Sequence, residues 1–214
     1  KTDFPYPPDR ISTDRENPRI KLKMEGPIMK IRRKNTIAWI RRFESHGSWY
    51  AEIHDYIWKT YADPILFANL LAATSPRKTV KANWKLANRI YREHKAGKPY
   101  SRIGLMPCHT GNIDRALSGI PLSGNKVRSF AENLCGNFDS VTIDVWILRY
   151  FGYDENKAIS DKLYAKISDK IRRIANKTGH SPASIQAILW TISRFNYGLG
   201  GSSFTAETKQ TQFS

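Results

Sequence analysis

The chain has 214 residues, a length that suits one large domain or two small ones and is enough to bury a sizeable core. Its 35 lysines and arginines outnumber 19 acidic residues and give a formal net charge of +16. A field of that sign attracts polyanions, and nucleic acid is the leading candidate partner, although a basic protein with no nucleic-acid role can have the same composition.

The two cysteines, Cys108 and Cys135, limit the metal chemistry of the chain. They are too few for a four-cysteine iron–sulfur cluster, and neither makes a zinc-binding spacing with a histidine. Reduced thiols are the default in the cytosol. No apolar run approaches the roughly 18 residues that cross a bilayer, and no secretory signal is visible. We therefore expect a cytoplasmic protein with no membrane contact and no protein-bound metal.

Composition divides the chain into three regions. Residues 1–28 are rich in proline and charge, which indicates an extended N-terminal segment. Residues 29–197 carry helical periodicity and form the predicted domain. Residues 198–214 are rich in glycine, serine and threonine and are predicted to form a flexible tail. The basic run at 30–34 suits a solvated face as well as a contact with a phosphate backbone.

The first half of the domain shows apolar residues at helical spacing. Ser48 and Ser75 are candidate caps, and Asp63 followed by Pro64 is a typical helix start. Regularly spaced aromatic residues here are more typical of a core than of a base-stacking surface. The predicted helices cover 36–43, 49–61, 65–73 and 80–91.

The second half continues the helical pattern, and no segment alternates as a strand would, so the predicted fold class is all-α. Residues 106–111 are predicted to form a loop in which His109 has no catalytic role. The predicted helix 159–175 is expected to present lysines and arginines on its outer face, namely Lys162, Lys166, Lys170, Arg172 and Arg173. The predicted helices cover 113–117, 127–134, 145–148, 159–175 and 183–195.

The stretch from Ala116 to Phe151 organises the chain. Residues 120–125 contain proline, serine, glycine and asparagine, which predict a tight turn between two helices. Lys126 lies at the mouth of this turn, and Asp144 precedes an apolar helix in the position of an N-cap.

This stretch resembles the helix-hairpin-helix DNA glycosylase superfamily, which contains endonuclease III and 8-oxoguanine glycosylase. The matching residues are the hairpin 120–126, the segment from Val141 to Asp144, and Arg149. Leu122 stands where the family usually has a glycine, Ser123 replaces an apolar residue, and Arg128 replaces a small one. A weaker likeness reaches upstream to Phe67, and small phage proteins of this fold are also similar. The resemblance implies two helical lobes around a cleft.

The resemblance also implies a DNA-binding surface. A monovalent cation held by hairpin carbonyls is common in the family. The break after residue 73 corresponds to a loop that can fill the gap left by an extruded base, although Ser75 could simply cap the next helix. The residues that this likeness assigns to DNA binding are Pro121, Leu122, Ser123, Gly124, Asn125, Val127, Arg128, Thr74, Arg77 and Lys78.

Two residues would carry the chemistry that the resemblance implies. Asp144 would stabilise positive charge on the sugar as the base leaves. Lys126, with a neutral amine, would attack C1′ and form a Schiff base, from which the 3′ phosphate leaves by β-elimination. The resemblance therefore implies a DNA glycosylase with AP lyase activity, a base excision repair enzyme. Each residue also has a plainer interpretation: Lys126 as a phosphate contact, and Asp144 as a cap worth ~1 kcal/mol.

Two other functions stay open from the sequence. One is a phage-type enzyme of the same fold that modifies a thymine derivative in DNA without base excision. The other is a non-catalytic DNA-binding module. In each case the expected partner is double-stranded DNA, bound by a nucleoid-associated monomer. The sequence does not identify the target base.

Overall fold

The computed structural model describes residues 35–156 and 158–198. The predicted N-terminal segment, the basic run at 30–34 and nearly all of the predicted tail lie outside these residues. Within them the chain forms nine α-helices and no strand, so the all-α prediction is confirmed. No helix in this part of the chain is long and apolar enough to span a membrane.

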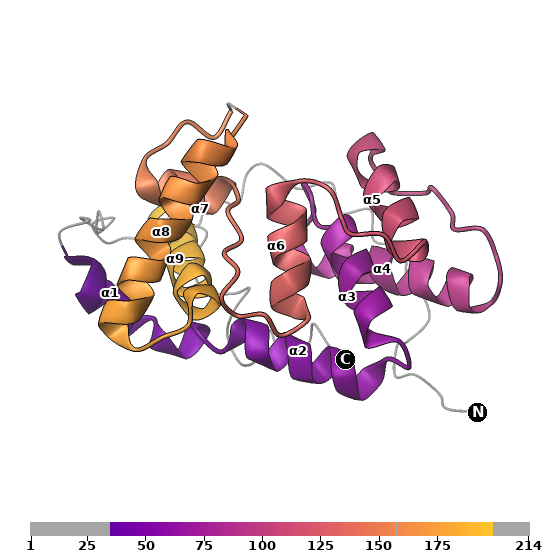
Figure 1. Cartoon of the computed structure of the whole chain (residues 1–214), viewed down its shortest axis with the longest axis horizontal. Helices are drawn as coiled ribbons and strands as arrows, with labels where there is room; N and C mark the ends of the chain where they lie inside the picture. The colour runs from indigo at the N-terminus through magenta and orange to yellow at the C-terminus, as the bar shows by residue number, and fades with distance from the viewer. Residues whose placement is uncertain (1–34, 157, 199–214) are drawn as a thin grey trace.

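A first lobe is built around α3 (Pro64–Ala73), which has seven of its ten residues buried. Figure 1 shows this lobe on the right. Asp63 caps α3 by accepting a hydrogen bond from the Leu66 amide at 3.1 Å, which confirms the predicted start. The helices packed around α3 are α2 (Trp49–Thr60), α4 (Val80–Lys95), α5 (Pro107–Leu117) and α6 (Asn125–Leu134).

A second lobe lies on the left in Figure 1 and has its own core. Ile147, Ile167 and Ile188 are fully buried there and come from three different helices. The segment from Val141 to Ile143 also packs in this core. The helices of the lobe are α1 (Thr36–Arg42), α7 (Val145–Phe151), α8 (Asp161–Thr178) and α9 (Pro182–Asn196), with the short 3₁₀ turn η2 (Glu44–His46) beside them.

The helix α2 joins the two lobes and runs along their lower edge in Figure 1. Tyr50 of α2 packs against Ala183 and Ala187 of α9. Its hydroxyl donates to Gln186 Oε1 at 2.8 Å within buried surroundings. Burial raises the pKa of Tyr50, so this link between the lobes is a neutral phenol.

Several predicted boundaries and caps are wrong in detail. Residues 107–111 are not a loop, because α5 already begins at Pro107, which suits a first helical turn. Thr79, rather than Ser75, caps α4, because its extended backbone lets its hydroxyl accept from the Ala82 amide at 3.2 Å. Ser48 makes no capping hydrogen bond. The Ser75 hydroxyl instead donates back to the Ala72 carbonyl at 2.8 Å.

His109 is fully buried in the first turn of α5. Its Nδ1 accepts from the Met106 amide at 3.1 Å, and its Nε2 donates to the Pro76 carbonyl at 2.9 Å. These bonds tie α5 to the loop after α3. A structural role for His109 agrees with the sequence interpretation, although the residue lies in a helix.

Candidate functional site

The predicted hairpin joins α5 to α6. α5 ends at Leu117, and the Ile120 amide returns to the Arg115 carbonyl at 2.8 Å. Gly124 precedes α6 with φ of 85° and ψ of 131°. L residues rarely adopt such a backbone, and a Cβ at Gly124 would meet no atom within 4 Å. Glycine is therefore needed here for its conformation.

Side chains of α5 hold the hairpin in place. Asn112 accepts from the Ser123 amide at 2.7 Å and donates to the Ser123 carbonyl at 3.1 Å. Arg115 Nε donates to the Pro121 carbonyl at 2.7 Å. Two hairpin carbonyls thus already accept hydrogen bonds from side chains, and one of the two donors, Arg115, is cationic. These two oxygens do not fit the monovalent cation that the resemblance suggests, because a cation there would be repelled by the Arg115 guanidinium.

The hairpin residues divide into exposed and buried groups. Pro121, Ser123, Gly124 and Arg128 are exposed, and Asn125 and Lys126 are half-buried. The side chains of Leu122 and Val127 are buried in the first lobe, which leaves only their backbone available for DNA. This differs from the expected surface because apolar residues beneath a tight turn complete the core on which the turn rests.

The loop after α3 presents fewer residues than expected. Thr74 is fully buried, and its hydroxyl lies 2.9 Å from the Leu70 carbonyl oxygen and 2.6 Å from Asn83 Oδ1. Thr74 is therefore a core residue in this structure and does not reach DNA. Lys78 Nζ donates to the Gly104 carbonyl at 2.8 Å. Arg77 is exposed and has φ of 57°, the single positive value among the described non-glycine residues.

Asp144 caps α7, which confirms the predicted N-cap. Its Oδ1 accepts from the amides of Trp146 at 3.0 Å and Ile147 at 3.1 Å. Its Oδ2 accepts from Trp190 Nε1 at 2.8 Å. The carboxylate is half-buried at a helix N-terminus, where a negative charge is favourable.

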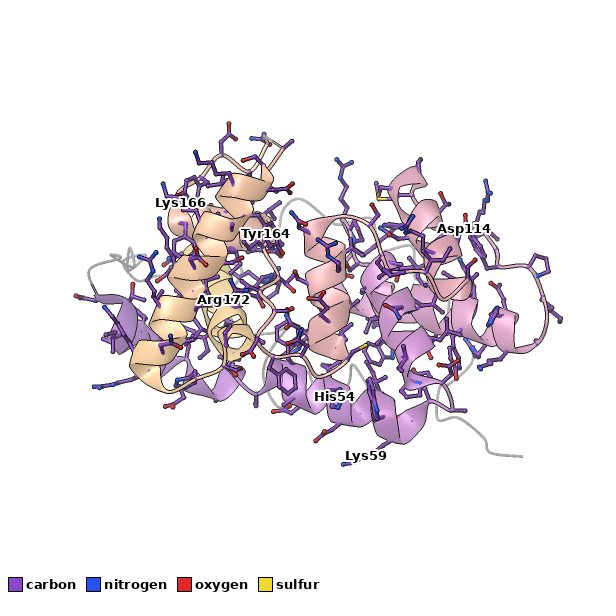
Figure 2. The ribbon with its side chains drawn as sticks, in the orientation of Figure 1. His54, Lys59, Asp114, Tyr164, Lys166 and Arg172 are labelled. Carbon is purple, nitrogen blue, oxygen red and sulfur yellow. The ribbon has the colours of Figure 1, made fainter. Side chains whose placement is uncertain are left out.

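Tyr164 connects the hairpin to the segment that leads to Asp144. Figure 2 shows its side chain on the side of α8 that faces α6. Its hydroxyl donates to the Val141 carbonyl at 2.7 Å, lies 3.3 Å from the Asn125 carbonyl, and accepts from the Ile143 amide at 3.2 Å. Burial raises the pKa of Tyr164, so the junction stays neutral. Asn125 and Ile143 are the chain neighbours of Lys126 and Asp144.

Asn133 fixes the other end of the same segment. With its amide assigned from its neighbours, it donates to the carbonyls of Ser140 at 2.9 Å and Asn137 at 2.8 Å, and accepts from the Thr142 hydroxyl at 3.1 Å. The segment 135–144 consequently runs back alongside α6 (Figure 1). The chain neighbours of Lys126 and Asp144 thus both lie within 3.3 Å of the Tyr164 hydroxyl.

A cluster of aromatic rings and guanidinium groups that contact one another begins beside Asp144. It consists of Trp190, Arg194, Trp146, Arg149 and Tyr197, and we call it the ladder. The Arg194 guanidinium lies 4.6 Å from the ring centroid of Trp190 and 5.2 Å from that of Trp146. The Arg149 guanidinium lies 4.3 Å from the ring centroid of Trp146 and 5.1 Å from that of Tyr197. Trp190 also packs against the core of the second lobe. The ladder was not predicted from the sequence. The available signal was the spacing of Trp190, Arg194 and Tyr197, which puts them on one face of α9 and its C-terminal extension.

Both guanidinium groups of the ladder have carboxylates nearby. Arg149 makes a two-pronged ion pair with Glu155, which raises the pKa of Arg149 and lowers that of Glu155. Burial lowers the pKa of Arg194, and the charge of Asp144 opposes that shift.

Comparison with known proteins identifies one family. A model described as "Family of unknown function (DUF7178)" matches residues 28–196, so the chain belongs to that family. No curated protein and no solved structure matches the chain.

Proposed function

We propose that this member of the DUF7178 family is a DNA glycosylase with AP lyase activity, built on a helix-hairpin-helix glycosylase fold. Lys126 is its nucleophile, and Asp144 is its electrostatic partner. Its substrate is double-stranded DNA that contains a modified or damaged base. The cleft between the lobes that this fold implies is part of the proposal.

One observation carries the proposal: the buried Tyr164 hydroxyl accepts a hydrogen bond from the Ile143 amide, next to Asp144, and lies 3.3 Å from the Asn125 carbonyl oxygen, next to Lys126. A lysine at a glycine hairpin and an aspartate at a helix start are each common features. Their connection through a single buried hydroxyl gives support that neither has alone, because a shared catalytic role requires the two residues to be held in fixed register.

The hairpin suits the binding of a phosphate. Gly124 has no side chain that could cap α6, so the first amides of this helix have no capping side-chain partner, and such amides bind anions well. A phosphate contact of this kind would fix the register of the duplex without reading its sequence. The exposed guanidinium of Arg128, held by Asn125 Oδ1 at 2.9 Å, adds positive charge at the same place.

The chemistry then runs through the two proposed residues. As the bond between C1′ and the base nitrogen breaks, the electron pair leaves with the base, and Asp144 stabilises the positive charge on the sugar. A bond forms between Lys126 Nζ and C1′, and loss of the amine proton and ring opening give a Schiff base. Removal of a C2′ proton then breaks the bond between C3′ and the 3′ phosphate oxygen.

A second candidate is the non-catalytic DNA-binding module. It is favoured by the fact that both carboxylate oxygens of Asp144 already accept hydrogen bonds within the protein. The phage-type enzyme that modifies a thymine derivative without base excision is the third candidate. The experiment below separates all three.

The test is a panel of duplexes, each with a single modified base, incubated with the full chain. The proposal expects base release and strand scission on at least one duplex. Lys126→Gln should abolish strand scission, whereas Lys162→Gln, an exposed lysine on α8, should leave it unchanged. DNA binding by Lys126→Gln should fall only slightly, since one charge among many is lost.

Other results of this experiment would favour a different mechanism or a different function. Base release without scission in Lys126→Gln would mean that water replaces the amine and that Asp144 alone carries base removal. Tight binding with no released base on any duplex contradicts the proposal. A mass change in a thymine derivative would then indicate the modifying enzyme, and unchanged DNA the binding module.

A further inference from the structure

The ladder lies at the edge of the second core, against which Trp190 packs, and its outer members are only partly covered. Tyr197 at its outer end is 58% exposed, and Trp146 is half-buried. Val145, next to Asp144, is also exposed, at 42%. Large apolar side chains left on the surface beside a candidate active site need a reason other than core packing.

The planar groups of the ladder contact one another and so restrict one another's side-chain freedom. The Arg149 guanidinium lies against both Trp146 and Tyr197, at 4.3 and 5.1 Å from their ring centroids. The ring of Trp146 also meets that of Tyr197 edge to face, with centroids 5.8 Å apart. Trp190 anchors the inner end by donating to Asp144. Such a surface loses little side-chain freedom when a flat ligand is added.

Both arginines of the ladder lie in the field of a carboxylate. Arg149 makes an ion pair with Glu155, and the charge of Asp144 acts on Arg194. These carboxylates weaken the attraction of the surface to phosphate and leave its flat groups for stacking. Nucleobases that have left the duplex stack on aromatic rings and on guanidinium planes.

We propose that the ladder is a stacking platform for a nucleobase that has left the duplex, placed beside Asp144. This inference deepens the proposed function by naming the surface that receives the extruded base, and it rests on that function for the identity of DNA as the partner. Tyr197 and Trp146 supply the accessible rings, Arg149 holds them in register, and Trp190 connects the platform to the carboxylate. Paired bases are hidden inside the duplex and gain nothing from it.

The test measures binding alone. The full chain is titrated with two duplexes that differ by one unpaired, bulged nucleotide, at several salt concentrations. Both affinities should fall with salt along parallel lines, because the phosphate contacts are shared. The bulged duplex should bind about tenfold more tightly at every salt concentration, since stacking is nearly independent of salt.

Tyr197→Ala should remove most of the preference for the bulged duplex and leave the slope of log affinity against log salt unchanged. Trp58→Ala is the matched control, because Trp58 is an aromatic residue that is 38% exposed on α2 in the other lobe.

A second readout does not depend on any variant. When 2-aminopurine is the bulged base, its fluorescence should fall on binding as it stacks on the platform. Equal affinity for the two duplexes, a preference that survives Tyr197→Ala, or a rise in 2-aminopurine fluorescence would each overturn the inference. Base release without a bulge preference would sink the platform and leave the glycosylase standing. A preference for the bulged duplex that depends on Tyr197, without base release on any duplex, would support the platform and contradict the glycosylase proposal.

Discussion

Asp144 carries three hydrogen bonds, and they change what can be expected of its substitution. Asparagine is as good an N-cap as aspartate, so the sequence alone suggests that Asp144→Asn costs little stability. The structure adds the bond from Trp190 Nε1 to Oδ2. With Oδ1 kept for the cap, the asparagine amide would turn an N–H toward the indole N–H and lose that bond.

We therefore predict that Asp144→Asn lowers the free energy of unfolding by about 1 kcal/mol, because the partly buried Trp190 N–H loses its acceptor. It should also lower base release about 100-fold or more, because the charge that steadies the sugar is gone. Chemical denaturation and single-turnover excision measure the two effects.

Trp190→Phe is the matched control for Asp144→Asn. It removes the same bond between indole and carboxylate but keeps the negative charge of Asp144. Its loss of stability should be comparable, and its loss of base release much smaller. Equal losses of activity in the two variants would assign the effect to packing and end the electrostatic role of Asp144.

At the scale of the element, Tyr164 of α8 keeps the hairpin and the segment before α7 in register. Tyr164→Phe keeps the ring but leaves the Ile143 amide and the Val141 carbonyl without this partner. We predict a loss of about 1 to 3 kcal/mol in the free energy of unfolding. Base release should fall more than DNA binding, because the register between Lys126 and Asp144 loosens while the surface charges remain.

Tyr100→Phe is the control, since the Tyr100 hydroxyl donates to Asp114 at an exposed position. Its stability should change by less than about 0.5 kcal/mol. If Tyr164→Phe binds and excises as the parent does, Tyr164 only supports the fold, and the observation that carries the proposed function loses its weight.

The sequence predicts the positions of the helices better than any other part of the structure. Periodicity places α3, α6 and α9 within two residues at each end, because a buried face must repeat with the helical turn. The start of α5 was missed because polar residues dominate its first turn. Caps are hard to choose from sequence, since Ser75 and Thr79 have similar chemistry and only the backbone conformation before α4 decides between them.

The candidate site was predictable only in part. Lys126 and Asp144 stand out by motif, and the cap at Asp144 follows from local chemistry. Contacts between distant segments leave no local pattern, so the Tyr164 junction could not be found from the sequence. Only the part of the ladder on α9 and its C-terminal extension, Trp190, Arg194 and Tyr197, leaves a signal in their spacing. The position of Thr74 after a helix predicts a place on the DNA-binding surface. In the structure its hydroxyl instead contacts the Leu70 carbonyl and Asn83 Oδ1 inside the core.

At the scale of the whole molecule, buried phenols set the response to alkaline pH. Burial raises the pKa of Tyr50, Tyr61 and Tyr164 above the ordinary value of about 10. Above that pH the unfolded chain releases these protons while the folded chain keeps them, so stability falls as pH rises. The contribution is fully present below pH ~10.

We predict that the free energy of unfolding begins to fall near pH ~10, by up to about 1.4 kcal/mol per pH unit for each phenol. Denaturant titrations between pH ~8 and ~11.5 measure it. Tyr61→Phe, which removes one of the three phenols, should give a shallower fall. A stability that stays level to pH ~11 contradicts the assignment of these phenols as buried and neutral.

Net charge sets the response to salt. The chain carries +16, and the outer face of α8 is basic as predicted, with Lys166 and Arg172 projecting from it in Figure 2. We predict that affinity for duplex DNA falls by orders of magnitude between ~50 and ~200 mM salt. Exposed Arg77 is a candidate phosphate contact, so Arg77→Gln should reduce the slope of log affinity against log salt by about one. An affinity that does not change with salt would mean that the charge serves another purpose.

Borohydride trapping tests the central claim most directly, because it reports the bond between Lys126 and the sugar. The full chain is incubated with each damaged duplex in the presence of borohydride, and the adduct is digested and mapped. The account predicts a covalent adduct on the duplex whose base is released, with the sugar attached at Lys126, and no adduct from Lys126→Gln. An adduct at another lysine, or none on any duplex whose strand the chain cleaves, would contradict it.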